Sequence, residues 1–164
     1  MIEKKWIYIA VAVIVVLGIA WYASTQMMGK TASGDLQQNG NGSQTYSNNE
    51  GSVTTGANAK MPSTWPTDAP ANYSGATIIF SGNSNPQTGK AGAVVSYSVQ
   101  NVTPEAVASY YRQTLAAKGW KIAGDASVGK QLILGATKDT RTFAISISEA
   151  TNNVVTVTAG LELQ

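Results

Sequence analysis

Short runs of alternating apolar and polar residues fill the chain between residues 61 and 164. The clearest run, residues 142–148, places apolar side chains at every second position: Phe143, Ile145 and Ile147. Side chains of a strand point alternately to its two faces, so this period of two predicts a strand with one buried face. Comparable runs predict further strands at residues 76–81, 93–100, 120–124, 131–137 and 154–164.

One segment has the spacing of a helix instead. Thr103 suits an N-cap, Pro104 suits the first helical position, and Gly119 suits the carboxyl-terminal end. The predicted buried stripe follows the intervals of one helical face: Val107, Tyr110, Tyr111, Thr114 and Leu115. Together, the elements predict an α+β domain in ββαββββ order, an antiparallel sheet with one helix packed on its apolar face.

The amino-terminal segment differs from the rest of the chain, because Trp6–Ala23 contains no charged residue. About eighteen residues of helix span roughly 27 Å, close to the thickness of the hydrocarbon core of a bilayer. We therefore expect a single transmembrane helix, with Lys4 and Lys5 keeping the amino terminus in the cytoplasm. A cleaved signal peptide is the alternative, although cleavage after Ala23 would put Trp21 where a small residue is usual.

Between residues 24 and 60 the chain is rich in Gly, Ser, Thr, Asn and Gln and almost free of large apolar residues. Such a composition buries too little apolar surface to fold, so we expect a disordered tether. The predicted regions are an anchor at residues 1–23, the tether at residues 24–60 and an extracytoplasmic domain at residues 61–164. Prolines favour an extended course at the start of this domain, where Trp65 and Tyr73 are expected to hold the chain against the sheet.

The composition argues against several kinds of chemistry. The 164 residues include no cysteine and no histidine. We therefore expect no nucleophilic triad, no zinc site of the Cys or His kind, no lipoprotein anchor and no disulfide in the fold. A net charge of +2 gives no reason to expect nucleic acid as a partner. We predict no catalytic residue, no cofactor and no metal site.

Two short motifs resemble catalytic signatures without the surroundings that those signatures need. Residues 127–130 have the Ser-x-x-Lys spacing of penicillin-binding enzymes, but they lie in a predicted hairpin loop and lack the partner motifs. Residues 82–90 resemble a phosphate-binding loop, but Ala91 stands where a magnesium-binding Ser or Thr is required. The carboxylates fall mostly at predicted turns, caps and strand ends, where structural or solvated roles are expected.

Serine and threonine occupy the polar positions of three predicted strands, and these positions share one face of the sheet. We predict this face as a candidate binding surface for a glycan or a protein: Ser96, Ser98, Ser146, Ser148, Thr156 and Thr158. An ordinary solvated sheet face is the alternative. A second candidate surface, for anionic lipid or wall polymer, is basic: Lys118, Lys121, Lys130, Lys138 and Arg141. Dispersed solubilising charge is the alternative there.

A further pattern joins the segment Tyr73–Thr77 to the helix start at Thr103–Glu105 and to residues of the helix and its end: Tyr110, Tyr111, Leu115, Gly119 and Trp120. This pattern resembles uncharacterised bacterial envelope proteins that are lipoproteins or carry a single membrane anchor. The resemblance implies a small extracytoplasmic α+β domain and carries over no catalytic residue.

From these features we expect a non-enzymatic, membrane-tethered binding or interaction module of the cell envelope, with its amino terminus in the cytoplasm and its domain outside. The expected partners are the membrane and an envelope protein or glycan. Two alternatives remain open. Two facing carboxylates in a cleft would favour a hydrolase of envelope polymers, whereas an exposed apolar patch or an unpaired edge strand would favour a structural subunit of a membrane or surface assembly.

Overall fold

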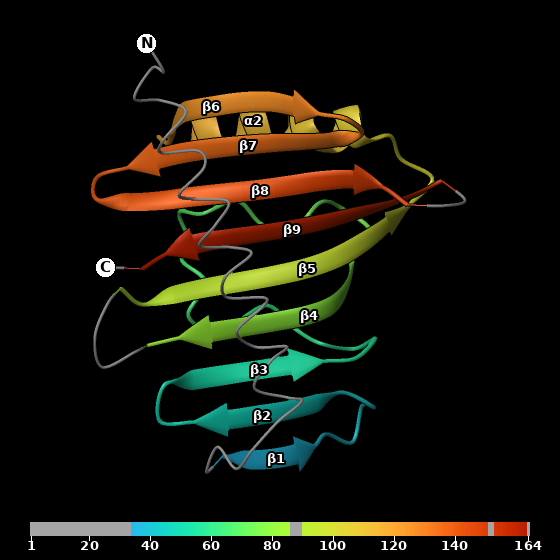
Figure 1. The fold of residues 1–164 in the computed structure, drawn as a ribbon, viewed down its shortest axis with the longest axis vertical. Helices are drawn as coiled ribbons and strands as arrows, with labels where there is room; N and C mark the ends of the chain where they lie inside the picture. Colours follow the sequence, from blue (N-terminus) through green and yellow to red (C-terminus); the bar gives the residue numbers. More distant parts are fainter. Residues whose placement is uncertain (1–33, 86–89, 151–152, 164) are drawn as a thin grey trace.

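The computed structural model describes residues 34–85, 90–150 and 153–163, and these residues form one nine-stranded antiparallel sheet with one helix (Figure 1). The first five strands are β1 (Asp35–Gln38), β2 (Gln44–Asn48), β3 (Gly51–Thr55), β4 (Thr77–Ser84) and β5 (Gly92–Gln100). The helix α2 (Pro104–Ala117) follows, and then β6 (Lys121–Val128), β7 (Gln131–Lys138), β8 (Arg141–Glu149) and β9 (Val154–Glu162). Across the sheet the strands lie in the order β1-β2-β3-β4-β5-β9-β8-β7-β6.

The helix carries the chain from the middle of the sheet to its far edge (Figure 1). It leads from β5 to the edge strand β6, and successive antiparallel pairings then return the chain to β9. The pairing of β5 with β9 runs from Gly92↔Glu162 to Gln100↔Val154. This long ladder joins the two halves of the sheet, which is therefore continuous from β1 to β6.

The helix begins and ends as the sequence predicts. The Thr103 hydroxyl accepts a hydrogen bond from the Ala106 N–H at 3.2 Å. After the helix, Gly119 has φ 78°, a left-handed conformation that glycine adopts without strain. The buried side comprises Val107, Ala108, Tyr111 and Leu115. The predicted helix is confirmed, although Tyr110 and Thr114 of the expected stripe are only half-buried.

The apolar face of the sheet is covered by α2 and by a long loop, residues 57–76, which we call the strap. The helix packs against β6, β7 and β8. In the strap, the Trp65 ring meets Phe143 edge-on with centroids 6.4 Å apart, and Tyr73 meets Tyr110 edge-on at 5.3 Å. The expected attachment of the strap through Trp65 and Tyr73 is therefore confirmed.

Two buried tyrosine hydroxyls are bonded to each other inside this core. The hydroxyl oxygens of Tyr97 and Tyr111 are 2.7 Å apart, and the Tyr73 N–H donates to the Tyr97 hydroxyl at 3.4 Å. Burial raises the pKa of Tyr97 to about 12 and also raises the pKa of Tyr111. Both phenols therefore stay neutral at physiological pH, and each satisfies the other within the apolar interior.

The predicted α+β class is wrong, because the described residues form a mostly-sheet fold with nine strands. The predicted ββαββββ order describes only β4 to β9 and lacks the strands β1 to β3. These three strands lie at residues 35–55, within the segment expected to be a disordered tether. Their pairing with β4 runs from Gly51↔Ser84 to Thr55↔Phe80. The edge of β4 offers unpaired backbone groups, so these strands form by backbone pairing although they bury little apolar surface.

The expected transmembrane helix at Trp6–Ala23 lies outside the described residues. Within residues 34–85, 90–150 and 153–163, no helix is long and apolar enough to cross a bilayer. The one helix among the described residues, α2, is amphipathic and packs on the sheet.

Candidate binding face

The side of the sheet opposite α2 and the strap carries all six predicted hydroxyl residues, and the strand register arranges them in two rows. The first row is Ser96↔Thr158↔Ser146, and the second is Ser98↔Thr156↔Ser148. Each row crosses the central strands β5, β9 and β8, which lie side by side in Figure 1. We call these six residues the hydroxyl face. The structure therefore brings together every residue of the predicted binding surface.

The alternation along each strand fixes this arrangement. In β5 the residues Val95, Tyr97 and Val99 are buried under the helix and the strap, so Ser96 and Ser98 must point the other way. Neighbouring strands lie about 4.8 Å apart, and every second residue of a strand is about 6.7 Å further along it. The six hydroxyls therefore form a regular grid on a shallow surface.

The two rows differ in their hydrogen bonding. In the first row, the Ser96 hydroxyl donates to the Val157 carbonyl at 3.2 Å and lies 3.1 Å from the Thr158 hydroxyl. Ser146 of the same row accepts from the Gln131 side-chain amide. In the second row, the hydroxyls of Ser98, Thr156 and Ser148 make no hydrogen bond to another described residue, and the three residues are partly exposed. The second row can therefore offer both donors and acceptors to a ligand.

A second polar region lies on the opposite side of the sheet, and the sequence did not predict it. A cavity of about 370 Å³ opens between strands β2 to β4 and the start of the strap. We call it the polar pocket; its lining comprises Asn39, Asn41, Ser43, Thr45, Ser52, Thr54, Asn58, Lys60, Met61, Pro62, Ser63, Ser81, Gly82 and Asn83. The available signal was the hydroxyl residues Thr45, Ser52 and Thr54, which share one face only because β2 pairs with β3.

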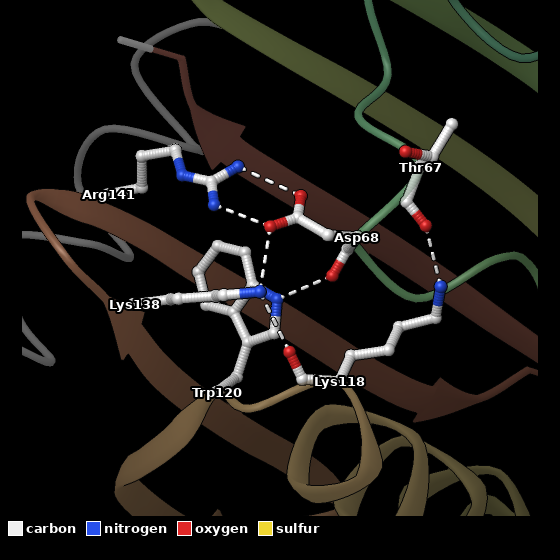
Figure 2. A network of polar contacts seen from close by, with 6 residues as sticks. All are labelled: Thr67, Asp68, Lys118, Trp120, Lys138 and Arg141. Carbon is white, nitrogen blue, oxygen red and sulfur yellow. Dashed lines mark hydrogen bonds and ion pairs between the residues drawn. The ribbon is translucent and has the colours of Figure 1, made fainter.

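Figure 2 shows where three of the five predicted basic residues lie. The carboxylate of Asp68, in the strap, receives two hydrogen bonds from Arg141, at 2.6 and 2.9 Å, and one from Lys138 at 2.8 Å. The Trp120 indole N–H donates to the Asp68 carbonyl at 2.7 Å, and Lys118 donates to the Thr67 carbonyl at 2.7 Å. We call this network the clasp.

The clasp fastens the strap to the end of α2 and to the turn between β7 and β8. Its hydrogen bonds to Arg141 and Lys138 hold the pKa of Asp68 well below its usual range. Arg141 also stacks over the Trp120 ring, with its guanidinium carbon 5.2 Å from the ring centroid. These contacts engage most of the predicted basic set internally, so the expected basic surface for an anionic polymer does not form as one patch.

Other charged groups are paired or dispersed. Arg112 of α2 contacts Glu105 and Asp125, each at 2.7 Å, and these pairs raise the pKa of the arginine. Residues 127–130, with the Ser-x-x-Lys spacing, lie at the end of β6 and in the turn to β7, as expected of a hairpin loop. Among the described residues, no group of three or more carboxylates converges as a metal site would require.

A family model described as START domain-like matches residues 80–158, which run from β4 through α2 to β9. The chain is thus similar to this family over the part of the sheet that carries the helix and the hydroxyl face, and the match indicates a small domain there. No curated protein gives a significant match to the chain. No solved structure matches it significantly either.

Proposed function

We propose that the protein is a non-enzymatic binding module whose hydroxyl face docks a glycan or an envelope protein. The arrangement of six short hydroxyl side chains in two adjacent rows is the observation that carries this proposal. A hydroxyl group donates and accepts hydrogen bonds and fits the many hydroxyls of a sugar polymer. A shallow, uncharged grid suits an extended ligand better than a compact one.

The positions of the carboxylates support a binding role over the alternative of a hydrolase. Hydrolysis of a glycosidic bond by the usual route needs two carboxyl groups facing each other across the scissile bond. Asp68 is engaged by Arg141 and Lys138, and Glu105 and Asp125 share Arg112. Each of these carboxylates already has a structural partner in the fold.

We further propose that the module works at the extracytoplasmic side of a cell membrane, with its amino terminus in the cytoplasm. This part rests on the sequence alone: Trp6–Ala23 is uncharged and follows Lys4 and Lys5. The resemblance to bacterial envelope proteins favours the same location. Protease added to intact cells stripped of any outer barrier should then degrade residues 61–164. Protection of this region until the membrane is broken would contradict the location.

The binding role is tested by removing the free hydroxyls of the second row in the full chain. The variant carries Ser98→Ala, Thr156→Val and Ser148→Ala, which keep the approximate shape of each side chain. A matched control removes one threonine and two serine hydroxyls elsewhere, through Thr64→Val, Ser74→Ala and Ser109→Ala. Both are compared with the unaltered chain on a glycan array and in pull-downs from native membranes.

The proposal predicts that the affinity of the second-row variant for the partner is lower than that of the unaltered chain by about tenfold or more, because each lost hydrogen bond weakens binding by about 1 kcal/mol. The control variant should keep the partner. Equal binding by the two variants would contradict the role of the hydroxyl face, provided that both unfold at the same denaturant concentration as the unaltered chain.

A further inference from the structure

We propose that the polar pocket is a second binding site, for a sugar acid, on the opposite side of the sheet from the hydroxyl face. The inference goes beyond the proposed function, because it concerns other residues and a small ligand. The cavity of about 370 Å³ lies at the lower end of the roughly 300–1,000 Å³ range of small-molecule sites. That volume suits one or two sugar rings.

The floor of the pocket is a sheet surface with unusual chemistry for its position. In the neighbouring strands β5 and β9, residues on this side form the apolar core, with Val95 and Val157 fully buried. In β2 and β3 the corresponding positions are Thr45, Ser52 and Thr54. A floor of hydroxyls under a loop leaves a polar, open-mouthed cavity, which water or a polar ligand fills.

Hydrogen bonds within the lining hold these side chains in place. The Asn39 amide donates to the hydroxyls of Ser43 and Thr45 at 2.9 and 3.0 Å, and the Thr45 hydroxyl lies 2.9 Å from that of Thr54. Asn41 and Asn58 each donate from the side-chain amide to the other's backbone carbonyl, at 3.0 and 2.6 Å. The start of the strap is thus tied to the β1–β2 turn, and the pocket is organised before any ligand arrives.

Several donors nevertheless lack a partner among the described residues. Ser81 is 4% exposed and lines the cavity, yet its hydroxyl makes no hydrogen bond to another described residue. The Asn83 carbonyl oxygen accepts from Ser52, whereas its NH₂ group makes no hydrogen bond within the described part of the chain. The Ser81 hydroxyl borders the cavity, so it is able to donate and accept hydrogen bonds with an occupant.

The charge of the pocket selects among polar ligands. Lys60 is the one charged residue among the described lining residues, and no described carboxylate pairs with it. It is exposed, so it stands at the opening rather than at the floor. Hydroxyl and amide groups inside and a cation at the rim fit a ligand with many hydroxyls and one carboxylate, which is the chemistry of a sugar acid.

The side-chain amides of the lining provide a direct test by nuclear magnetic resonance. The ¹⁵N-labelled full chain is titrated with sodium glucuronate, with glucose and with sodium acetate. The inference predicts that glucuronate shifts the side-chain NH₂ signals of Asn39, Asn41, Asn58 and Asn83. Those of Asn72 and Asn101, which lie outside the pocket, should not move. Acetate should have little effect, and glucose should bind more weakly than glucuronate.

Two variants and a matched control complete the test. Ser81→Ala should weaken glucuronate binding by about fivefold, the equivalent of one hydrogen bond. Lys60→Gln should lower the affinity for glucuronate to that for glucose, whereas Lys130→Gln, in the turn between β6 and β7, should leave both affinities unchanged.

If glucuronate at tens of millimolar does not shift the four side-chain NH₂ signals, the proposal of a sugar-acid site is wrong. If the shifts survive unaltered in Ser81→Ala and Lys60→Gln, or if acetate alone reproduces them, it is wrong as well. Sugar binding lost only in the second-row variant would support the hydroxyl face and overturn the pocket.

Discussion

The two ends of the sheet are held together by different forces. Strands β5 to β9 bury one face under α2 and the strap, and their inward side chains include Tyr97, Phe143 and Ile147, all fully buried. Strands β1 to β3 contain no buried residue at all among those described, and Leu36 in β1 is 68% exposed. Apolar burial therefore stabilises the helix-covered half, whereas backbone pairing and side-chain hydrogen bonds hold the polar half.

This contrast also separates stability from binding. The residues that stabilise the fold form the apolar cluster between the sheet and its cover, and the two candidate sites use hydroxyl and amide side chains that do not belong to that cluster. Substitutions of the stabilising residues should therefore lower the free energy of unfolding with little effect on binding. Substitutions in the two candidate sites should weaken binding with little effect on the free energy of unfolding.

Phe143→Ala should produce the largest loss of stability. The ring is fully buried and contacts Trp65, Tyr111 and Trp120, with centroids 6.0 to 6.4 Å away. Truncating such a ring typically lowers the free energy of unfolding by about 3–5 kcal/mol. Chemical denaturation of the full chain measures the change. Val53→Ala, in the half-buried β3, is the matched control and should lower the free energy of unfolding by about 1 kcal/mol or less.

Removing β1 to β3 should have a smaller effect than Phe143→Ala. Residues 61–164 retain the helix, the clasp and all the strands of the covered half. We predict that this fragment unfolds cooperatively, as followed by circular dichroism, at a denaturant concentration between those of the full chain and of Phe143→Ala. A fragment that stays unfolded in buffer would show that the polar strands are required for the fold.

Asp68→Asn should lower stability by about 1–2 kcal/mol at pH 7, because it leaves Arg141 and Lys138 without their carboxylate. The loss of stability is this small because the Asp68 side chain is 35% exposed and solvent screens its ion pairs. Asp139→Asn, in the exposed turn between β7 and β8, is the matched control and should change stability far less.

The pH dependence follows from the lowered pKa of Asp68. The carboxyl group of Asp68 binds a proton less readily in the folded chain than in the unfolded chain, where its pKa is near 3.8. Its contribution to stability is therefore present above about pH 4 and is lost as the pH falls below that value. Between pH 5 and pH 2 the unaltered chain should lose more stability than Asp68→Asn does. Parallel curves for the two proteins would contradict the role of the clasp.

The sequence predicted the covered half of the molecule well. In α2, the cap at Thr103 and the turn at Gly119 are local signals, and they placed both ends of the helix. In β8, apolar side chains at every second residue identified the buried face and hence the opposite face, which carries Ser146 and Ser148. Period and capping were sufficient there because burial and local geometry determine those elements.

The polar half could not be predicted in the same way. Residues 44–48 and 51–55 have no apolar alternation, because the strands that they form bury little on either face. β3 is ordered by pairing with the edge of β4, which is distant in the sequence, and β2 pairs in turn with β3. The polar pocket was missed for the same reason, since its lining comes from these strands and from the strap. The hydroxyl face was predicted because each of its residues alternates with a core residue.

Hydrogen exchange of the full chain tests the contrast between the two halves most directly. The account predicts that backbone amides in β5, β8 and β9 exchange only on global unfolding, so that Phe143→Ala accelerates their exchange. Amides in β1 and β2 should exchange through local opening, which has a much lower free energy than global unfolding, and Phe143→Ala should leave their exchange rates nearly unchanged. Equal protection in both halves, accelerated to the same degree by Phe143→Ala, would show that the polar strands belong to the same cooperative core and would contradict the account.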